Sequence, residues 1–311
     1  MKINYSQAVI GYLRDAELRH SPHTISDYSI TFRKFAEWLD SDPALDDISS
    51  DQVKTFLASL AQRARPLSKK TILNYHTGLS ALWTWATVEG YANRHILREV
   101  PRPKPEKRVI RPLTESDIKA ILGVVDRSTW YDRPGKIAND HRRPTARRDR
   151  AIILTLLDTG MRASELCRLT IEDADLRNQR VYVFGKGSKE RMLPLSARTT
   201  KTIWRYLTKE RGQDRLSSPL FSQRNGQPIT RTSLRQLLLR LGQRAGVRNV
   251  HPHRFRHTFA INSLRNGMNA YALKMALGHS TMEMVRQYLE LVQADLDAAH
   301  RRASPVEHWQ L

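Results

Sequence analysis

The sequence has few cysteines, few acidic side chains and no long apolar run. Cys167 is the single cysteine among 311 residues, which excludes an intramolecular disulfide framework and suits a reducing compartment. No stretch approaches the roughly 18 apolar residues of a transmembrane helix. The first residues, MKINYSQAVIGYLRDAELRH, lack the apolar core of a secretory signal. We therefore expect a cytoplasmic protein without a membrane partner.

The shortage of acidic residues leaves a large positive charge. The chain has 52 Lys and Arg against 31 Asp and Glu, a net charge of +21. Residues 1–100 hold 12 basic and 11 acidic side chains, so residues 101–311 hold 40 and 20. Such an excess predicts an anionic partner, for which nucleic acid and an anionic membrane surface are the usual candidates.

A basic, Pro-rich segment divides the chain. Residues 98–112 read REVPRPKPEKRVIRP and contain six basic side chains. Prolines at alternate positions favour an extended, semi-rigid backbone. We expect a linker here, between residues 1–97 and residues 113–311, that either lies along a polyanion or is simply solvated.

Residues 1–97 have the periodicity of three or four amphipathic helices and no strand-like alternation. Apolar side chains recur at spacings of three and four over residues 25–39, 53–60 and 72–82. Thr24 is a candidate N-cap, and Ser49 forms a capping box with Gln52. These features predict a small helical bundle.

Three groups of basic residues are candidates for contact with a polyanion. The first forms one cluster in the bundle, for which solvation is the usual explanation: Arg63, Arg65, Lys69 and Lys70. The linker group is Arg102, Lys104, Lys107 and Arg108. Residues 127–150 have eight basic and three acidic side chains, together with Pro and Gly, and so predict an exposed loop. Its candidates are Arg142, Arg143, Arg147 and Arg148.

The second part combines helices with one β signal. Helices are expected from Thr114 and over AIILTLLDTG, which ends at Gly160. The apolar run VYVF, the turn-like GKGSKE and the return MLPL predict a hairpin with Lys186 at its turn. From about Ser196 the pattern is again helical.

Several polar residues in the second part could do chemistry, although each has an ordinary explanation. Arg162 begins a helix, where an arginine most often forms a surface ion pair. A lysine in a turn, such as Lys186, usually faces solvent. Tyr288 lies on an amphipathic helix, where tyrosine is more often half-buried packing.

Histidines cluster around residues 251–257 in a pattern that could suggest zinc. His253 and His257 are spaced i, i+4, with His251 and His279 as further ligands. However, the residues between the first two include Arg256 and a second arginine, whose charges oppose a divalent cation. We therefore expect no metal.

The motifs, in this order and at these spacings, resemble the tyrosine recombinases, also called the phage integrase family, and within it the Xer-like and integrase-like members. The matching stretches are TGMRASELCRLT, VFGKGSKERMLPL, HPHRFRHTFA and LGHSTMEMVRQYLE. The 24-residue step from Arg162 to Lys186 and the nine-residue step from His279 to Tyr288 also resemble the family. The resemblance is strong over most of residues 114–295 and looser before the linker.

The resemblance implies a mainly α fold in two domains. Residues 1–97 would form a SAM-like helical core-binding domain that contacts DNA. Residues 113–311 would form an α+β catalytic domain, with helices around a small hairpin or sheet and a C-terminal tail. Residues 289–311 would dock in cis or on a neighbouring protomer.

The resemblance also implies a reaction, which the residue types suit. Cleaving DNA without metal, ATP or another cofactor requires a nucleophile that keeps the bond energy in a covalent ester, together with a proton donor for the leaving oxygen. Tyr288 would attack the scissile phosphate to give a 3′-phosphotyrosine and a free 5′-hydroxyl. His253 would act as its general base, and Lys186 as the general acid.

Positive donors would surround the reacting phosphate. Arg162 and Arg256 would clamp its non-bridging oxygens, because a guanidinium fork fits phosphate better than an ammonium does. His279 would donate a further hydrogen bond. Glu165 and His257 would orient these groups.

The implied partners are double-stranded DNA and three further copies of the chain, since two rounds of strand exchange across a tetramer give recombination through a Holliday junction. The location would be the nucleoid. Two alternatives stay open: a catalytically silent DNA-binding relative and a type IB topoisomerase. The stretch between Thr114 and Arg162 is longer than in compact Xer proteins, which favours a phage or mobile-element enzyme.

Overall fold

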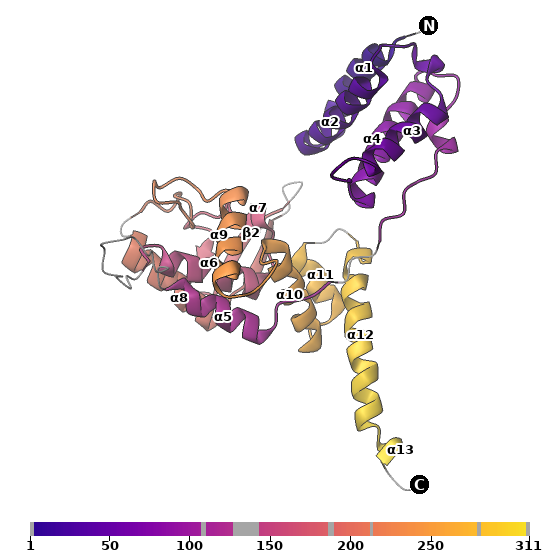
Figure 1. Cartoon of the computed structure of the whole chain (residues 1–311). Coiled ribbons are helices and arrows are strands. Elements are labelled where there is room, and N and C mark those ends of the chain that lie inside the picture. The colour runs from indigo at the N-terminus through magenta and orange to yellow at the C-terminus, as the bar shows by residue number, and fades with distance from the viewer. Residues whose placement is uncertain are drawn as a thin grey trace, which may run out of the picture. The chain divides into compact units, whose positions relative to one another are not determined.

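The structure is a computed structural model that describes residues 3–106, 110–126, 143–185, 190–211, 214–278 and 281–308. Its contacts divide the chain into two compact units, Met1–Val109 and Ile110–Leu311. Each unit has its own hydrophobic core (Figure 1). Helices dominate and the strands form one small sheet, which confirms the expected fold class. Within the described ranges, no helix is long and apolar enough to cross a membrane.

The first unit is a bundle of four helices, at the upper end of the expected number. They are α1 (Tyr5–Glu17), α2 (Pro22–Leu39), α3 (Ser50–Ala61) and α4 (Lys69–Val88), with the 3-10 turns η1 (Leu45–Asp47) and η2 (Ile96–Glu99). The capping box of Ser49 and Gln52 begins α3, as predicted. The prediction for α2 was wrong by one turn: Ser21, not Thr24, is its N-cap, because the following proline is preset for a first helical turn.

Aromatic side chains fill the core of this bundle. Phe35 is fully buried, and its ring centre lies 5.0 to 6.4 Å from those of Tyr5, Phe56 and Trp83. Most of these pairs are tilted or edge-on, the arrangement that the charge distribution of aromatic rings favours. The four helices are therefore joined through one aromatic cluster.

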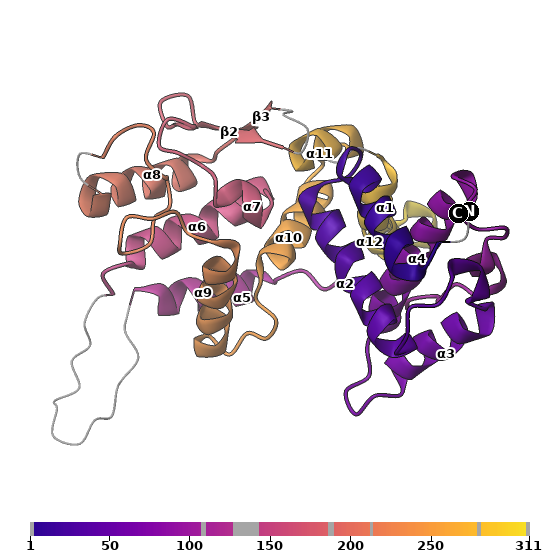
Figure 2. The same cartoon turned by 90° about the horizontal axis from the view of Figure 1, so that it is seen from above.

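The second unit arranges its helices around a small sheet. The helices are α5 (Glu115–Val125), α6 (Ala146–Thr159), α7 (Ala163–Leu166), α8 (Ala197–Tyr206), the π-helical turn η3 (Leu207–Arg211), α9 (Arg231–Arg244), α10 (Pro252–Arg265), α11 (Ala270–Leu277), α12 (Glu283–Ala303) and α13 (Pro305–His308). In Figure 2, α10 lies between α6 on one side and α11 and α12 on the other, and it packs against all three.

The sheet is antiparallel, with the order β1-β2-β3. The strands are β1 (Ala174–Asp175), β2 (Arg180–Phe184) and β3 (Glu190–Pro194). The pairing of β2 with β3 confirms the predicted hairpin, whereas the two-residue β1 was missed because it is too short to show alternation. Val181 and Val183 face the core, and their partners across the ladder are Leu193 and Arg191. Arg191 is therefore a charged residue at a core-facing position.

The segment predicted as a basic loop ends sooner than expected. Helix α6 already begins at Ala146, so its first turn was wrongly assigned to the loop. Asp149 is fully buried in that turn and accepts hydrogen bonds at 2.7 Å from Arg143 and Arg148. These ion pairs hold the start of α6 in the folded unit. Residues 127–142 lie outside the described ones.

Candidate active site

A tight turn after α6 brings the first candidate residue into place. Gly160 ends α6 with a φ of 59°, a left-handed conformation that favours glycine. A Cβ on Gly160 would lie 2.3 Å from Cδ1 of Phe259, so a side chain there would also clash with α10. Two residues later Arg162 becomes the N-cap of α7.

Arg162 is held by two partners and still reaches solvent. Its Nη1 donates to Oε1 of Glu165 at 2.9 Å, and its backbone N–H donates to Oε2 of the same carboxylate at 2.7 Å. Its Nη2 donates to the carbonyl oxygen of Gly278 at 3.0 Å. The side chain is 32% exposed, so a ligand can approach the remaining donors.

Arg256 projects from α10 toward the same turn. It is buried, and its Nη1 and Nη2 donate to the carbonyl oxygens of Gly160 and Leu277 at 2.9 and 2.7 Å. Two effects lower the pKa of this guanidinium to about 10: mainly burial, and secondly repulsion from the charge of Arg162. Arg256 therefore keeps its positive charge at neutral pH.

Glu165 is the buried anion between these cations. Burial alone would raise the pKa of its carboxyl, but hydrogen bonds from Arg191 and Arg162 outweigh burial and lower the pKa to about 2. Arg191 donates from Nη1 to Oε1 at 3.0 Å and from Nη2 to Oε2 at 2.8 Å. We did not expect Arg191 in the site, although a charged residue facing the core of a strand was a usable signal.

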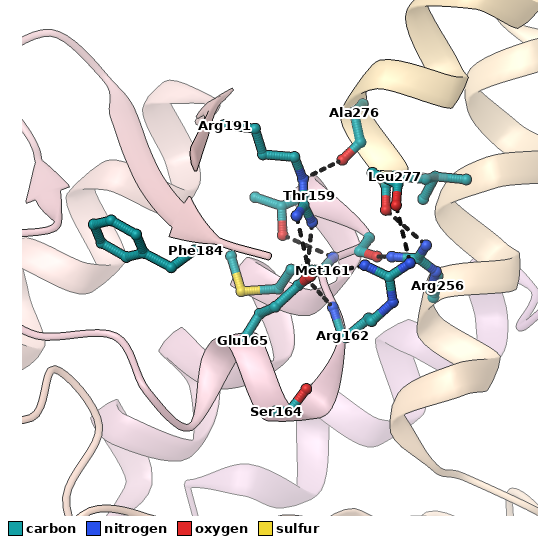
Figure 3. Close-up of polar contacts among 12 residues, drawn as sticks. Thr159, Met161, Arg162, Ser164, Glu165, Phe184, Arg191, Arg256, Ala276 and Leu277 are labelled. Carbon is teal, nitrogen blue, oxygen red and sulfur yellow. Dashed lines mark hydrogen bonds and ion pairs between the residues drawn. The ribbon is translucent and has the colours of Figure 1, made fainter. Parts of the chain in front are cut away.

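The end of α11 joins the three arginines. Its last carbonyls accept in sequence: Ala276 from Arg191, Leu277 from Arg256, and Gly278 from Arg162 (Figure 3). The final carbonyls of a helix have no partner within the helix and carry partial negative charge. This helix end therefore orients three guanidinium groups that would otherwise repel one another.

Tyr288 lies on α12 with its hydroxyl held by α10. The hydroxyl is 2.8 Å from Nδ1 of His257. Burial raises the pKa of Tyr288, and the charge of Arg256 only partly opposes this. Burial and the charges of His253 and His251 lower the pKa of His257 to about 4, so its ring is neutral at pH 7 and can accept the phenol proton.

The hydrogen bond to Tyr288 differs from the one that the sequence suggested. We expected His253 to face the phenol, whereas the described contact is made by His257, one turn further along α10. His253 is exposed in the first turn. Its pKa is lowered by partial desolvation and then by the charges of Arg256 and Arg162, and it lies three residues before Arg256 on the same face of α10.

The remaining predicted residues divide into three groups. Five lie outside the described residues: Lys107, Arg108, Arg142, Lys186 and His279. Six are exposed on the first unit: Arg63, Arg65, Lys69, Lys70, Arg102 and Lys104. The other three form ion pairs within the second unit, since Arg147 contacts Glu210 at 3.5 Å and Asp149 holds Arg143 and Arg148.

Two models of known protein families match this chain. The model of the Phage integrase family matches residues 112–294, and that of the phage integrase N-terminal SAM-like domain matches residues 11–90. The chain belongs to the phage integrase family of tyrosine recombinases. It is accordingly a tyrosine-type site-specific recombinase, an enzyme that breaks and rejoins DNA strands.

Curated relatives align with nearly the whole recombinase. Tyrosine recombinase XerC of Bacillus pumilus is 28% identical over 305 residues, covering 95% of this chain and 94% of the relative. Tyrosine recombinase XerA of Thermococcus kodakarensis is 30% identical over 288 residues, covering 92% and 91%. These matches do not favour a silent DNA-binding relative or a type IB topoisomerase.

Solved structures share the fold. The integrase of transposon Tn1549 in complex with a circular intermediate DNA has a TM-score of 0.73 at 21% identity, covering 96% of this chain and 99% of that one. XerH recombinase bound to a palindromic difH substrate has a TM-score of 0.70 at 22% identity, covering 89% and 79%. The likeness supports the expected combination of a SAM-like bundle and a catalytic domain.

Proposed function

We propose that this recombinase cleaves double-stranded DNA by attack of Tyr288 on the scissile phosphate, which leaves a 3′-phosphotyrosine and a free 5′-hydroxyl. The observation that carries the proposal is the 2.8 Å contact between Tyr288 and His257, on the helix that also bears Arg256. A phenol with a raised pKa is a weak nucleophile and needs a neighbouring base. The neutral His257 ring would accept its proton.

Arg162 and Arg256 would stabilise the extra negative charge of the five-coordinate phosphorus. Both keep donors near the Gly160 turn while their other donors are fixed on carbonyl oxygens. Preorganised donors of this kind typically contribute roughly 10² to 10³ each in rate. His253, beside the pair, would add a hydrogen bond to the phosphate, as would His279, and Lys186 would protonate the leaving 5′-oxygen.

The domain roles follow from the same proposal. Residues 1–97 would bind DNA through Arg63, Arg65, Lys69 and Lys70, and the linker at 98–112 through Arg102, Lys104, Lys107 and Arg108. Residues 113–311 would cleave as part of a tetramer, at the chromosome in the cytoplasm. We further propose a mobile-element role, because the chain between Thr114 and Arg162 contains the long basic segment.

A covalent-capture experiment tests the proposal. Nicked duplexes with a randomised core would be incubated with the full chain, denatured, and recovered through the DNA covalently linked to protein. We expect adducts with the wild-type chain and none with Tyr288→Phe. On the captured site, His257→Phe should slow adduct formation by roughly 10² or more. An adduct that persists in Tyr288→Phe, or no adduct on any sequence, would refute the proposal.

A further inference from the structure

Arg191 is the one member of the arginine cluster without a part in the proposed reaction. We propose that it is a positioning residue for cleavage: it balances the charge of Glu165, so that this carboxylate orients Arg162 without neutralising it. The inference rests on the proposed function, because it requires Arg162 to act on the scissile phosphate. It adds a residue to which the proposed reaction gives no direct role.

The geometry of Arg191 fits a fixed structural charge rather than a substrate-binding one. Its side chain is 13% exposed, and the three donor nitrogens of the guanidinium are all used. Two of them meet both oxygens of Glu165, and Nε donates to the carbonyl oxygen of Ala276 at 3.0 Å. A planar guanidinium can make these three bonds at once, whereas an ammonium cannot reproduce the fork.

The charges explain why a second cation is needed. Glu165 orients Arg162 through two hydrogen bonds, one to the guanidinium and one to the backbone. If these two were alone, the pair would be neutral and Arg162 would attract a phosphate only weakly. Arg191 on the opposite side of the carboxylate restores a net positive charge, so the group of Arg162, Glu165, Arg191 and Arg256 has two positive charges in excess.

Arg191 is also packed against the helix end that holds the other arginines. A Cβ added to Gly278 would lie 2.9 Å from Nη1 of Arg191, so the guanidinium and this backbone are in close contact. Gly278 in turn accepts from Arg162. A change at Arg191 therefore affects Arg162 in two ways. It removes the positive charge of Arg191 from beside Glu165, and it alters the packing around Gly278, whose carbonyl oxygen binds Arg162.

The test measures single-turnover adduct formation on the site captured above, at saturating DNA. We expect Arg191→Met to slow cleavage by roughly 10- to 100-fold, the usual cost of losing a partner that orients an active-site group. DNA affinity should change little, whereas the melting temperature should fall, because Glu165 stays buried with one ion-pair partner fewer. The matched control is Arg180→Met, which removes the same charge from the neighbouring strand β2, where the side chain is exposed and donates to the sulfur of Met192.

A second substitution separates this role from a merely structural one. In the double variant Arg191→Met/Glu165→Gln, the carboxylate charge that would neutralise Arg162 is gone. We therefore expect the double variant to cleave at least several-fold faster than Arg191→Met alone. Melting temperatures of all variants are measured beside the rates, and cleavage is followed well below the lowest of them, so that recovery of the rate reports the charge at Arg162 and not the recovery of the fold.

The outcomes are distinct. Wild-type speed in Arg191→Met, or a double variant no faster than Arg191→Met, overturns the inference about Arg191. If the wild-type chain itself forms no Tyr288-dependent adduct, the proposed function fails instead. If Arg191→Met does not fold, Arg191→Gln takes its place under the same criteria, since it also removes the charge while leaving an amide donor beside Glu165.

Discussion

Single residues of the site have protonation states that their neighbours fix. At neutral pH Glu165 is ionised, with a pKa of about 2, and Arg256 is charged, with a pKa of about 10. His257, with a pKa of about 4, is neutral. The site thus combines a group of positively charged arginines with an uncharged imidazole ring beside Tyr288. These two properties are compatible, because burial lowers the pKa of His257 and the positive charge of Arg256 acts in the same direction.

Glu165 leads to a prediction about stability and pH. Its pKa is lowered in the folded chain, so its stabilisation is fully present above about pH 4.5 and is lost as the pH falls toward 2. From the size of the shift, we expect the difference in unfolding free energy between the wild type and Glu165→Gln to be about 2 kcal/mol smaller at pH 3 than at pH 7. Urea titrations at the two pH values measure it.

The control for this prediction is a surface carboxylate. Glu115 also has a lowered pKa, through Lys119, but it is exposed. Glu115→Gln should therefore show almost no difference between the two pH values, because exposed ion pairs contribute little. If the difference in unfolding free energy between the wild type and Glu165→Gln is the same at pH 3 and pH 7, the pKa of Glu165 is not lowered in the folded chain and the prediction is wrong.

At this scale the sequence identified motif residues but not all their partners. Arg162, Arg256 and Tyr288 stand in motifs with recognisable spacing, so their place in the site could be predicted. Arg191 stands in a matching stretch too, yet its partner Glu165 is 26 residues away, and no local pattern links them. The choice of His257 over His253 as the partner of Tyr288 depended on the rotation of α10 relative to α12.

At the scale of the elements, the ends of two helices position the arginines of the site. The C-terminus of α11 places three carbonyls opposite three arginines, and the turn after α6 supplies a further carbonyl through Gly160. The capping box of Ser49 and Gln52 predicted where α3 begins. The sequence did not predict where α6 begins, because the buried pairs of Asp149 stabilise a first turn with a loop-like composition.

Gly160 leads to a prediction about these elements. Gly160→Ala forces alanine into a left-handed conformation, at about 1 to 2 kcal/mol, and also pushes a methyl group into Phe259. We expect a loss of roughly 2 to 5 kcal/mol in unfolding free energy and, in any variant that folds, slower cleavage because the backbone shift displaces the carbonyl oxygen of Gly160, one of the two that hold Arg256. Denaturant unfolding and the adduct assay measure the two effects.

The matched control is Gly246→Ala. Gly246 has a similar φ of 71°, but an added Cβ would meet nothing within 4 Å. Only the conformational cost of about 1 to 2 kcal/mol should remain, with no change in cleavage. Equal losses at both positions would show that the contact with Phe259 does not matter.

On the scale of the whole molecule, the positive charges fall into two groups: internal ones that pair with buried carboxylates, and exposed ones. The net charge of +21 belongs almost entirely to residues after 100. Some of it is internal, as at Arg143, Arg148 and Arg191, where guanidinium groups hold buried carboxylates. The exposed remainder includes Arg102 and Lys104. Exposed cations of this kind make binding to DNA phosphates depend steeply on salt.

The linker leads to a prediction about salt. Arg102→Ala and Lys104→Ala should each lower the slope of log affinity against log salt by about 0.9, because each removes one released counterion. Cleavage of saturated DNA should be unaffected. Binding titrations at several salt concentrations measure the slope. Arg19→Ala, whose guanidinium pairs with Asp15, is the control and should leave the slope unchanged. If Arg102→Ala or Lys104→Ala cleaves more slowly than the wild type at saturating DNA, these side chains do more than bind DNA, and the prediction is wrong.

The sequence by itself determined the family, the mainly helical class and the motif residues, because caps, periodicity and spacing are local properties. The tertiary structure decided which partners those residues have. Glu165 is shared by arginines from two elements, the end of α11 orients three guanidinium groups, and Tyr288 meets His257. Apart from the pair of Arg162 and Glu165, which are neighbours on one helical turn, these contacts join segments distant in the chain, and their energies depend on burial, which only the packed fold establishes.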